Sequence, residues 1–360
     1  MRRPHRSSRP NYISNKLPPA SPNIKTTTTT MTTPTPAATH LLKQSVKLAL
    51  VQLACTADKA ANLRHARTKV LEATKQGAKI VVLPECFNSP YGTKYFPQYA
   101  EQLQGVTRGS PPTQEQSPTF HALSSLAKES GAYIIGGSIP ELVPGKESSS
   151  TTTTSTPENS SKDSSESSKP KYYNTNMTFS PTGQLIATHR KVHLFDISIP
   201  NKITFRESDV LSPGSKITLV DLPEYGRIAI AICYDIRFPE LATIAARRGA
   251  FLLVYPGAFN LTTGALHWEL QARARAVDNQ VFVALCSPSR DMDAEYNAWG
   301  HSCVVDPNAE VLGMLDEKEG VLIRELEVGR IEEVRKGIPV YSQRRFDVYP
   351  DVAEGGKFEE

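Results

Sequence analysis

Apolar runs typical of strands alternate with segments of helical periodicity over residues 46–336, which limits the fold to helices packed on sheets. The strand at 174–179 is expected to pair with those at 133–139 and 184–188. The expected strands cover residues 46–53, 80–83, 133–139, 174–179, 184–188, 217–222, 227–232, 251–255, 281–286, 301–306, 310–314 and 321–326. The expected helices cover residues 58–76, 118–130, 241–248, 266–279 and 328–336. This pattern predicts one α/β domain.

Two low-complexity stretches and a short tail lie outside this alternation. Residues 1–45 are basic, lack acidic residues and are rich in Ser, Thr and Pro. They are predicted to be either a mitochondrial transit peptide or a plain disordered extension, with Met31 as an alternative start. Residues 144–170 are rich in Ser and Thr, which predicts an elongated hairpin loop within the domain at 46–349. Residues 350–360 form the C-terminal tail.

Composition limits the cellular compartments and the classes of binding partner that are expected for this chain. The five cysteines are odd in number and lack zinc-like spacing, which fits a reducing intracellular compartment. The cytoplasm, the mitochondrion or both are the expected locations. No apolar run reaches the length of a membrane span, so no membrane partner is expected. The basic N-terminus contains one aromatic residue, Tyr12, which argues against nucleic-acid binding.

Cys233 follows the apolar run at 227–232 and precedes a helical pattern that begins near Glu240. A strand-to-helix junction can expose a sulfur and point the following backbone N–H groups at an anion. A nucleophilic thiolate is presented in this way. The alternative is a small apolar core residue, which is the usual environment of a free cysteine.

Two charged residues occupy comparable places at strand ends. Glu85 closely follows the run at 80–83, where burial would raise its pKa toward that of a general base. Lys191, flanked by apolar residues, would supply a fixed positive charge that stabilises an oxyanion and lowers a thiol pKa. A solvated loop glutamate and an exposed edge-strand lysine are the alternatives. Together the three residues favour a catalytic site.

These three segments resemble the catalytic segments of the nitrilase superfamily, the carbon–nitrogen hydrolases. The matching residues are 83–85 for the glutamate, 190–196 for the lysine and 233–240 for the nucleophile, in the family's order. The resemblance spans nearly all of the non-repetitive chain and implies a four-layer α-β-β-α sandwich. It also implies a homodimer and no metal or organic cofactor.

The resemblance further implies hydrolysis of a carboxamide through a thioester on Cys233. In this scheme Glu85 acts as general base and acid, while Lys191 and the backbone N–H of Tyr234 hold the oxyanion. A second glutamate of the family corresponds to Glu207, which is expected to position the amide nitrogen or Lys191.

Residues 204–208, 252–264 and 267–270 resemble the omega-amidase branch of the superfamily. That branch acts on short dicarboxylic monoamides such as 2-oxoglutaramate and 2-oxosuccinamate, so the expected partner is a small amide. The Tyr234–Asp235 pair is amidase-like and argues against nitrile hydrolysis. The alternatives are a deaminated glutathione amidase, an N-carbamoyl amino acid amidohydrolase and, more remotely, a non-catalytic binding protein.

Candidate substrate-binding residues lie near the same motifs. The distal carboxylate of such a substrate needs a cation or several hydrogen-bond donors. Arg237 is expected instead to pair with Asp235 or Glu240. The expected donors are Tyr91, Arg206, Thr262 and Thr263, and the expected pocket walls are Phe195 and Phe259.

Overall fold

The computed structural model describes residues 40–103, 110–145, 169–201 and 203–348. Most of the expected extension at 1–45, the interior of the expected loop at 144–170 and the whole tail at 350–360 lie outside the described residues. The strands on either side of that loop pair with each other, with Val143 opposite Lys171.

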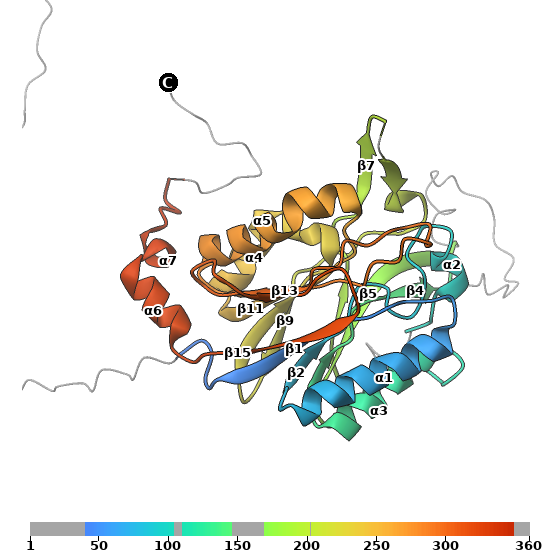
Figure 1. Ribbon diagram of the computed structural model, residues 1–360, viewed down its shortest axis with the longest axis horizontal. Coiled ribbons are helices and arrows are strands. Elements are labelled where there is room, and N and C mark those ends of the chain that lie inside the picture. The colour runs from blue at the N-terminus through green and yellow to red at the C-terminus, as the bar shows by residue number, and fades with distance from the viewer. Residues whose placement is uncertain (1–39, 104–109, 146–168, 202, 349–360) are drawn as a thin grey trace, which may run out of the picture. The chain divides into compact units, whose positions relative to one another are not determined.

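Two mixed sheets form the centre of the domain (Figure 1). The first has the order β15-β1-β2-β3-β5-β4, and β6 also pairs with β5. Its strands are β1 (Val46–Gln52), β2 (Ile80–Val82), β3 (Tyr133–Ile135), β4 (Ile139–Val143), β5 (Lys171–Phe179), β6 (Leu185–Arg190) and β15 (Gly320–Leu326). The second has the order β14-β13-β12-β11-β10-β9. Its strands are β9 (Thr218–Leu222), β10 (Gly226–Ile230), β11 (Ala250–Pro256), β12 (Phe282–Cys286), β13 (Cys303–Val305) and β14 (Val311–Met314).

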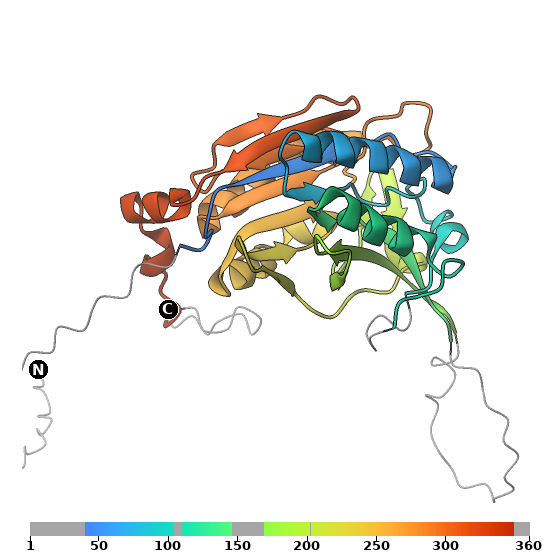
Figure 2. The same ribbon diagram turned by 90° about the horizontal axis from the view of Figure 1, so that it is seen from below.

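Helices cover the outer face of each sheet (Figures 1 and 2). The first sheet carries α1 (Lys59–Lys75) and α3 (Pro118–Ser130), and the second carries α4 (Pro239–Arg247) and α5 (Leu261–Asn279). The side chains of Asp58 and Ser117 cap α1 and α3 by accepting backbone N–H groups. The remaining helices of the described residues are α2 (Phe96–Tyr99), α6 (Arg330–Gly337), α7 (Val340–Gln343) and the 3-10 turns η3 (Glu207–Asp209) and η4 (Cys233–Arg237).

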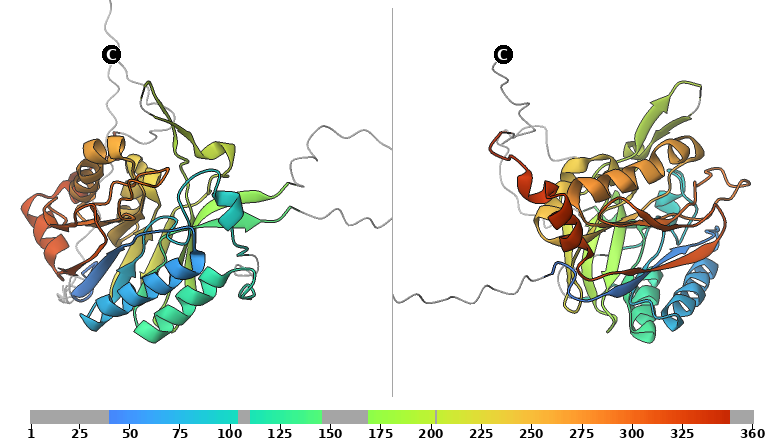
Figure 3. Two further views of the ribbon diagram at one scale, coloured as in Figure 1. Left: turned by 45° about the vertical axis from the view of Figure 1, so that its right-hand side comes forward. Right: turned by 60° about the vertical axis from the view of Figure 1, so that its left-hand side comes forward.

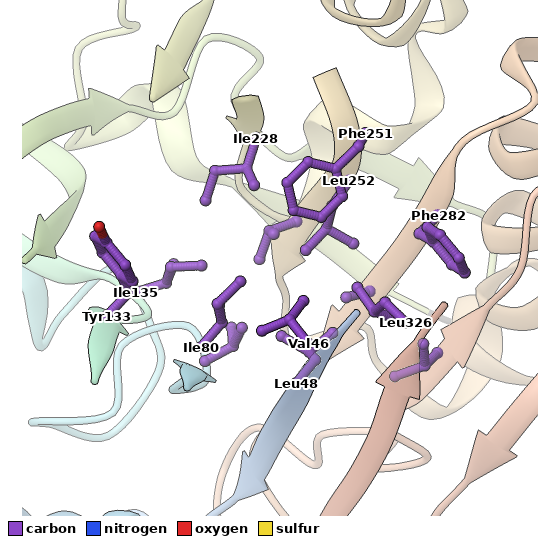
Figure 4. Close-up of a cluster of buried hydrophobic side chains, with 14 of the residues drawn as sticks. Val46, Leu48, Ile80, Tyr133, Ile135, Ile228, Phe251, Leu252, Phe282 and Leu326 are labelled. Carbon is purple, nitrogen blue, oxygen red and sulfur yellow. The ribbon is translucent and has the colours of Figure 1, made fainter. Parts of the chain in front are cut away.

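Apolar side chains fill the three spaces between these four layers. Between the sheets, residues such as Leu48 and Ile80 of the first meet Ile228 and Leu252 of the second (Figure 4). A second cluster joins the first sheet to α1 and α3, and a third joins the second sheet to α4 and α5. This arrangement confirms the expected α-β-β-α sandwich.

Two regions differ from the expected strands. The run at 133–139 is split, because the chain turns at Gly136 and Gly137 between β3 and β4. The hairpin of β7 (Asp196–Ile199) and β8 (Ile203–Arg206) was not predicted, since each strand is too short for its alternation to stand out. It projects from the rest of the domain (Figure 3). No helix in the described ranges is long and apolar enough to cross a bilayer.

Candidate active site

A polar centre forms at one edge of the facing sheets, from residues that follow the ends of three strands. Glu85 follows β2, Cys233 follows β10 and Ala258 follows β11. Lys191 directly follows β6, which pairs with β5 in the first sheet. Segments from both sheets therefore meet, and this edge is where α/β proteins commonly place ligands.

The carboxylate of Glu85 is fully buried and held at both oxygens. Its Oε1 accepts hydrogen bonds from Asn174 Nδ2 at 2.8 Å and from Lys191 Nζ at 3.1 Å. Its Oε2 accepts the backbone N–H of Ala258 at 2.7 Å. The thiol of Cys233 interacts with the same carboxylate. The alternative interpretation of Glu85, a loop glutamate exposed to solvent, is thus ruled out.

Lys191 lies between two carboxylates. Its Nζ is 2.9 Å from Glu207 Oε1 and 3.1 Å from Glu85 Oε1. Glu207 Oε1 also accepts the hydroxyl hydrogen of Tyr91 at 2.7 Å, and its Oε2 accepts the backbone N–H of Phe195 at 2.8 Å. The side chain of Lys191 is fully buried, so it is not an exposed edge-strand lysine.

Cys233 occupies a strained turn. Its φ of 49° lies in the left-handed region that residues other than glycine seldom adopt. Gly257 packs directly against this turn, because a Cβ added there would lie 3.1 Å from the Cα of Cys233. The residue is 3% exposed, so the structure does not show the exposed sulfur that the strand-to-helix junction suggested.

Burial and charge set the protonation of the centre. Burial, together with the charge of Glu85, raises the pKa of the Cys233 thiol well above its usual value, and Lys191 offsets only part of this. Lys191 does lower this pKa, as expected, but burial and Glu85 outweigh its effect. Burial raises the pKa of Glu85 against the opposing effect of Lys191. The two glutamates overcome burial and hold the pKa of Lys191 well above its usual value.

Asp235 connects the lysine segment to the nucleophile turn. Its Oδ2 lies 3.2 Å from His189 Nε2, and its Oδ1 lies 2.8 Å from His193 Nδ1. The backbone N–H groups of His193 and Ile232 also donate to this carboxylate, at 2.9 Å each. These bonds hold the pKa of the buried Asp235 below its usual range despite burial. Residues two positions either side of Lys191 are thereby fixed to the turn that starts at Cys233.

A cavity of about 590 Å³ reaches this centre. Glu85, Tyr91, Ala258 and Tyr296 are among its lining residues. Tyr296 donates its hydroxyl hydrogen to the carbonyl oxygen of Ala258 at 2.6 Å, and its ring lies 4.5 Å from that of Tyr91. The cavity is large enough for a small organic amide.

The expected substrate-binding residues are distributed unevenly around the centre. Tyr91 lines the cavity, and Phe195 packs against Tyr234 with ring centroids 5.2 Å apart. The Arg206 side chain is 63% exposed and pairs with Asp209, so it does not face the centre.

Phe259 and the two threonines belong to the surroundings of α5. Phe259 is buried against Trp268, with ring centroids 5.1 Å apart. The backbone N–H and hydroxyl of Thr263 both donate to Asn260, which caps α5, and Thr262 lies in the first turn of that helix. None of these three residues lines the cavity described above.

Arg237 was wrongly expected to pair with an acid. Asp235 is occupied by the two histidines, and Arg237 has no acidic partner within 4.0 Å in the described ranges. Its Nη1 lies 3.2 Å from His267 Nδ1, its guanidinium lies 4.8 Å from the ring centre of Phe259, and its Nε is buried without a partner. It interacts electrostatically with Cys233, so a cation that has no acidic partner among the described residues lies near the nucleophile.

Sequence reasoning missed Asn174, Asp235 and Tyr296. A signal existed for the first, because Asn174, Asn176 and Thr178 are polar at every second position of a strand and therefore share one face. All three prove to be buried. Asp235 was singled out only as part of an amidase-like pair and as a partner of Arg237, and no comparable pattern marks Tyr296. In the described part of the chain, no group of His, Cys, Asp and Glu side chains is arranged to hold a metal ion.

Comparison with known proteins places these features in a family. The sequence profile of the carbon-nitrogen hydrolase family matches residues 47–336. The chain is 52% identical to hydrolase C26A3.11 of Schizosaccharomyces pombe, over 88% of this chain and 87% of that protein. It is 49% identical to omega-amidase NIT2 of Homo sapiens, over 85% of this chain and 97% of that protein.

Comparison with solved structures supports the same family. The crystal structure of Saccharomyces cerevisiae Nit3, described as a member of branch 10 of the nitrilase superfamily, superimposes with a TM-score of 0.70. The alignment covers 86% of this chain and all of that chain at 43% sequence identity.

Proposed function

This chain belongs to the carbon–nitrogen hydrolase family, and we propose that it is an omega-amidase that releases ammonia from short dicarboxylic monoamides such as 2-oxoglutaramate. The observation that carries this proposal is the similarity, at about half of all aligned positions and over most of the chain, to relatives named omega-amidase. The buried grouping of Glu85, Lys191, Glu207 and Cys233 supports it, because this grouping supplies each chemical role that amide hydrolysis requires.

The reaction starts from a neutral thiol. Because the pKa of Cys233 is raised well above its usual value, the thiol stays protonated until attack, and a base must take its proton. Glu85 interacts with this thiol and is the base in our proposal. The sulfur attacks the amide carbon while the proton passes to Glu85, which then delivers it to the departing nitrogen as ammonia forms.

Lys191 and the backbone N–H of Tyr234 stabilise the oxyanion of the tetrahedral intermediate in this scheme. A positive charge in a buried site is well suited to this, since it requires little reorganisation during the reaction. Glu207 neutralises Lys191 and leaves Glu85 free to exchange protons. Water, activated by Glu85, then hydrolyses the thioester and restores the Cys233 thiol and the free carboxylic acid.

Arg237 is the residue that we propose binds the distal carboxylate of the substrate. Among the described residues its guanidinium has no acidic partner and its buried Nε has no hydrogen-bond partner, and it interacts electrostatically with the nucleophile. Arginine is suited to carboxylates because its planar fork forms two parallel hydrogen bonds. This assignment replaces Arg206, whose exposed side chain pairs with Asp209.

We also propose that the active protein is a homodimer joined through α4 and α5. Leu266, Leu270 and Val277 lie on one face of α5 and are exposed, as is Ile244 on the adjacent α4. An aligned apolar stripe of this kind is typical of an interface, and a second copy presents the complementary surface in a two-fold arrangement. The cytoplasm and the mitochondrion are the proposed compartments, on the basis of the sequence alone.

The function is tested by ammonia release from 2-oxoglutaramate, deaminated glutathione and an N-carbamoyl amino acid, with wild-type protein and Cys233→Ala. We expect release chiefly from 2-oxoglutaramate and none from the variant. Preference for another amide of the panel would replace the proposed substrate while keeping the reaction. No release from any of them by folded protein would contradict the proposed function.

A further inference from the structure

Asn174 on β5 contacts both the proposed base and the lysine segment. Its side-chain Nδ2 donates to Glu85 Oε1 at 2.8 Å, and its backbone carbonyl accepts the N–H of Lys191 at 2.9 Å. The residue is 1% exposed. Neither the family's catalytic segments at 83–85, 190–196 and 233–240 nor the chemistry described above includes this residue.

The side-chain amide of Asn174 makes no other hydrogen bond among the described residues. Its Nδ2 makes one hydrogen bond, to Glu85, and its Oδ1 is buried without a hydrogen-bond partner among the described residues. A buried polar atom left unpaired is costly. The orientation of the amide follows from its neighbour, because a carboxylate oxygen requires the N–H end and repels the oxygen end.

A neutral donor at this position has a specific effect on the base. Burial favours protonated Glu85, whereas hydrogen bonds to the carboxylate favour the ionised form. Asn174 provides such a bond without adding a charge and without binding the oxyanion. The titratable groups that act electrostatically on Glu85, or that Glu85 acts on, are Lys191, Glu207, Cys233, Cys86, Tyr91 and Tyr296.

We propose that Asn174 is a positioning residue for Glu85, whose amide keeps the carboxylate ionised and directed toward Cys233. This inference rests on the proposed role of Glu85 as the base that takes the Cys233 proton. It does not depend on the identity of the amide substrate, so the two can be tested apart.

The test follows alkylation of Cys233 by iodoacetamide as a function of pH, with the modified Cys233 peptide quantified by mass spectrometry. This reaction requires removal of the thiol proton but no substrate. In Asn174→Ala we expect the acidic limb of the rate profile to move to higher pH by about one unit, because losing a hydrogen bond to a charged group favours protonated Glu85. Asn174→Asp adds a carboxyl group beside Glu85 and should shift the limb further in the same direction.

The matched control is Asn279→Ala, which removes another buried asparagine amide, in α5, whose Nδ2 donates to the carbonyl oxygen of Arg275 at 3.0 Å. We expect a lower melting temperature and an unchanged limb. If Asn174→Ala does not fold, Asn174→Thr is used, because threonine suits a strand and cannot reproduce the amide contact.

A limb at the wild-type pH in a folded Asn174 variant would overturn the inference, whatever the loss of stability. A shifted limb in a protein whose wild type releases no ammonia from any tested amide would contradict the proposed function and support the role of Asn174. The pH profile of kcat/KM for 2-oxoglutaramate should shift in parallel with the alkylation profile.

Discussion

Glu207 determines how the charges of the buried centre are shared. It receives hydrogen bonds from Tyr91 and from the backbone of Phe195, in addition to the ammonium group of Lys191. Lys191 thus has a fixed counterion, and Glu85 can gain and lose a proton without leaving the lysine unpaired. This division of roles requires two carboxylates beside one lysine, one to pair with the lysine and one to exchange the proton.

Loss of Arg237 should affect recognition of the substrate carboxylate more than the chemistry. In Arg237→Met we expect the KM for 2-oxoglutaramate to rise about 10–100-fold, as for the loss of hydrogen bonds to a charged group. Hydrolysis of pentanamide, a neutral amide of the same length, should change much less. Steady-state kinetics on both substrates would measure this.

Arg206→Met is the control for the preceding variant, since Arg206 is exposed and paired with Asp209. We expect its kinetics on both substrates to match those of the wild type. Equal losses on the two substrates in Arg237→Met, or a selective loss in Arg206→Met, would contradict the assignment of the carboxylate site.

At the scale of elements, the turn between β3 and β4 supports the turn that carries Glu85. Gly137 has a φ of 54°, and a Cβ added there would lie 1.9 Å from the carbonyl oxygen of Pro84. The N–H of Ser138 donates to the same oxygen at 3.3 Å, and the Ser138 hydroxyl accepts the N–H of Cys86 at 3.1 Å. The conformation of one loop therefore depends on close approach by the other.

Gly137→Ala should displace Glu85 and lower both stability and turnover. The left-handed φ alone costs a residue with a Cβ about 1–2 kcal/mol, and the clash with Pro84 adds to this. Gly131→Ala is the matched control, because Gly131 has a φ of 61° and no atom within 4 Å of an added Cβ.

We expect the control to lose about 1–2 kcal/mol of unfolding free energy with little change in kcat, and Gly137→Ala to lose more together with most of its activity. Urea denaturation and ammonia release would measure the two effects. Wild-type kcat in Gly137→Ala would show that this turn does not hold Glu85 in place.

The Ser/Thr-rich insertion joins two strands that already pair at its base. Val143 lies opposite Lys171, so the hairpin needs only a short connection. Replacing residues 146–168 by a short Gly/Ser linker should leave turnover unchanged and raise the unfolding free energy by no more than about 1–2 kcal/mol, because loop closure depends weakly on length. Denaturation and kinetics would check this, and a tenfold loss of kcat would contradict it.

At the scale of the whole molecule, the stacking of two sheets creates the centre, because each sheet contributes part of it. Glu85 and Lys191 follow strands of the first sheet, whereas Cys233 and Ala258 follow strands of the second. The apolar cluster between the sheets holds these strand ends together. The outer helices protect the opposite faces, and the exposed stripe on α4 and α5 is the surface that we assign to the second subunit.

Charges placed on this stripe should dissociate the dimer. Leu266 is 61% exposed and Leu270 is 62% exposed, so Leu266→Glu with Leu270→Glu removes little from the monomer's core. We expect the mass measured by light scattering after size exclusion to fall from that of two chains to that of one. Met314→Glu, an exposed position on β14, is the control and should remain a dimer.

The order of strands and helices was determined by local sequence, because hydrophobic periodicity and capping residues act over a few positions. Local sequence also placed Glu85, Lys191 and Cys233 at strand ends. Their correspondence to the family's catalytic segments then identified them as candidate catalytic residues. The short β7–β8 hairpin was missed because four-residue strands carry too little pattern.

Tertiary structure alone decided the contacts between distant segments. Asn174 and Glu85 are separated by 89 positions, and Asp235 and His189 by 46, so no local pattern could pair them. Arg237 was assigned to the wrong partner for the same reason: His189 and His193, on either side of Lys191, occupy Asp235. The raised pKa of Cys233 likewise follows from burial and from the charge of Glu85, a residue that follows a strand of the other sheet.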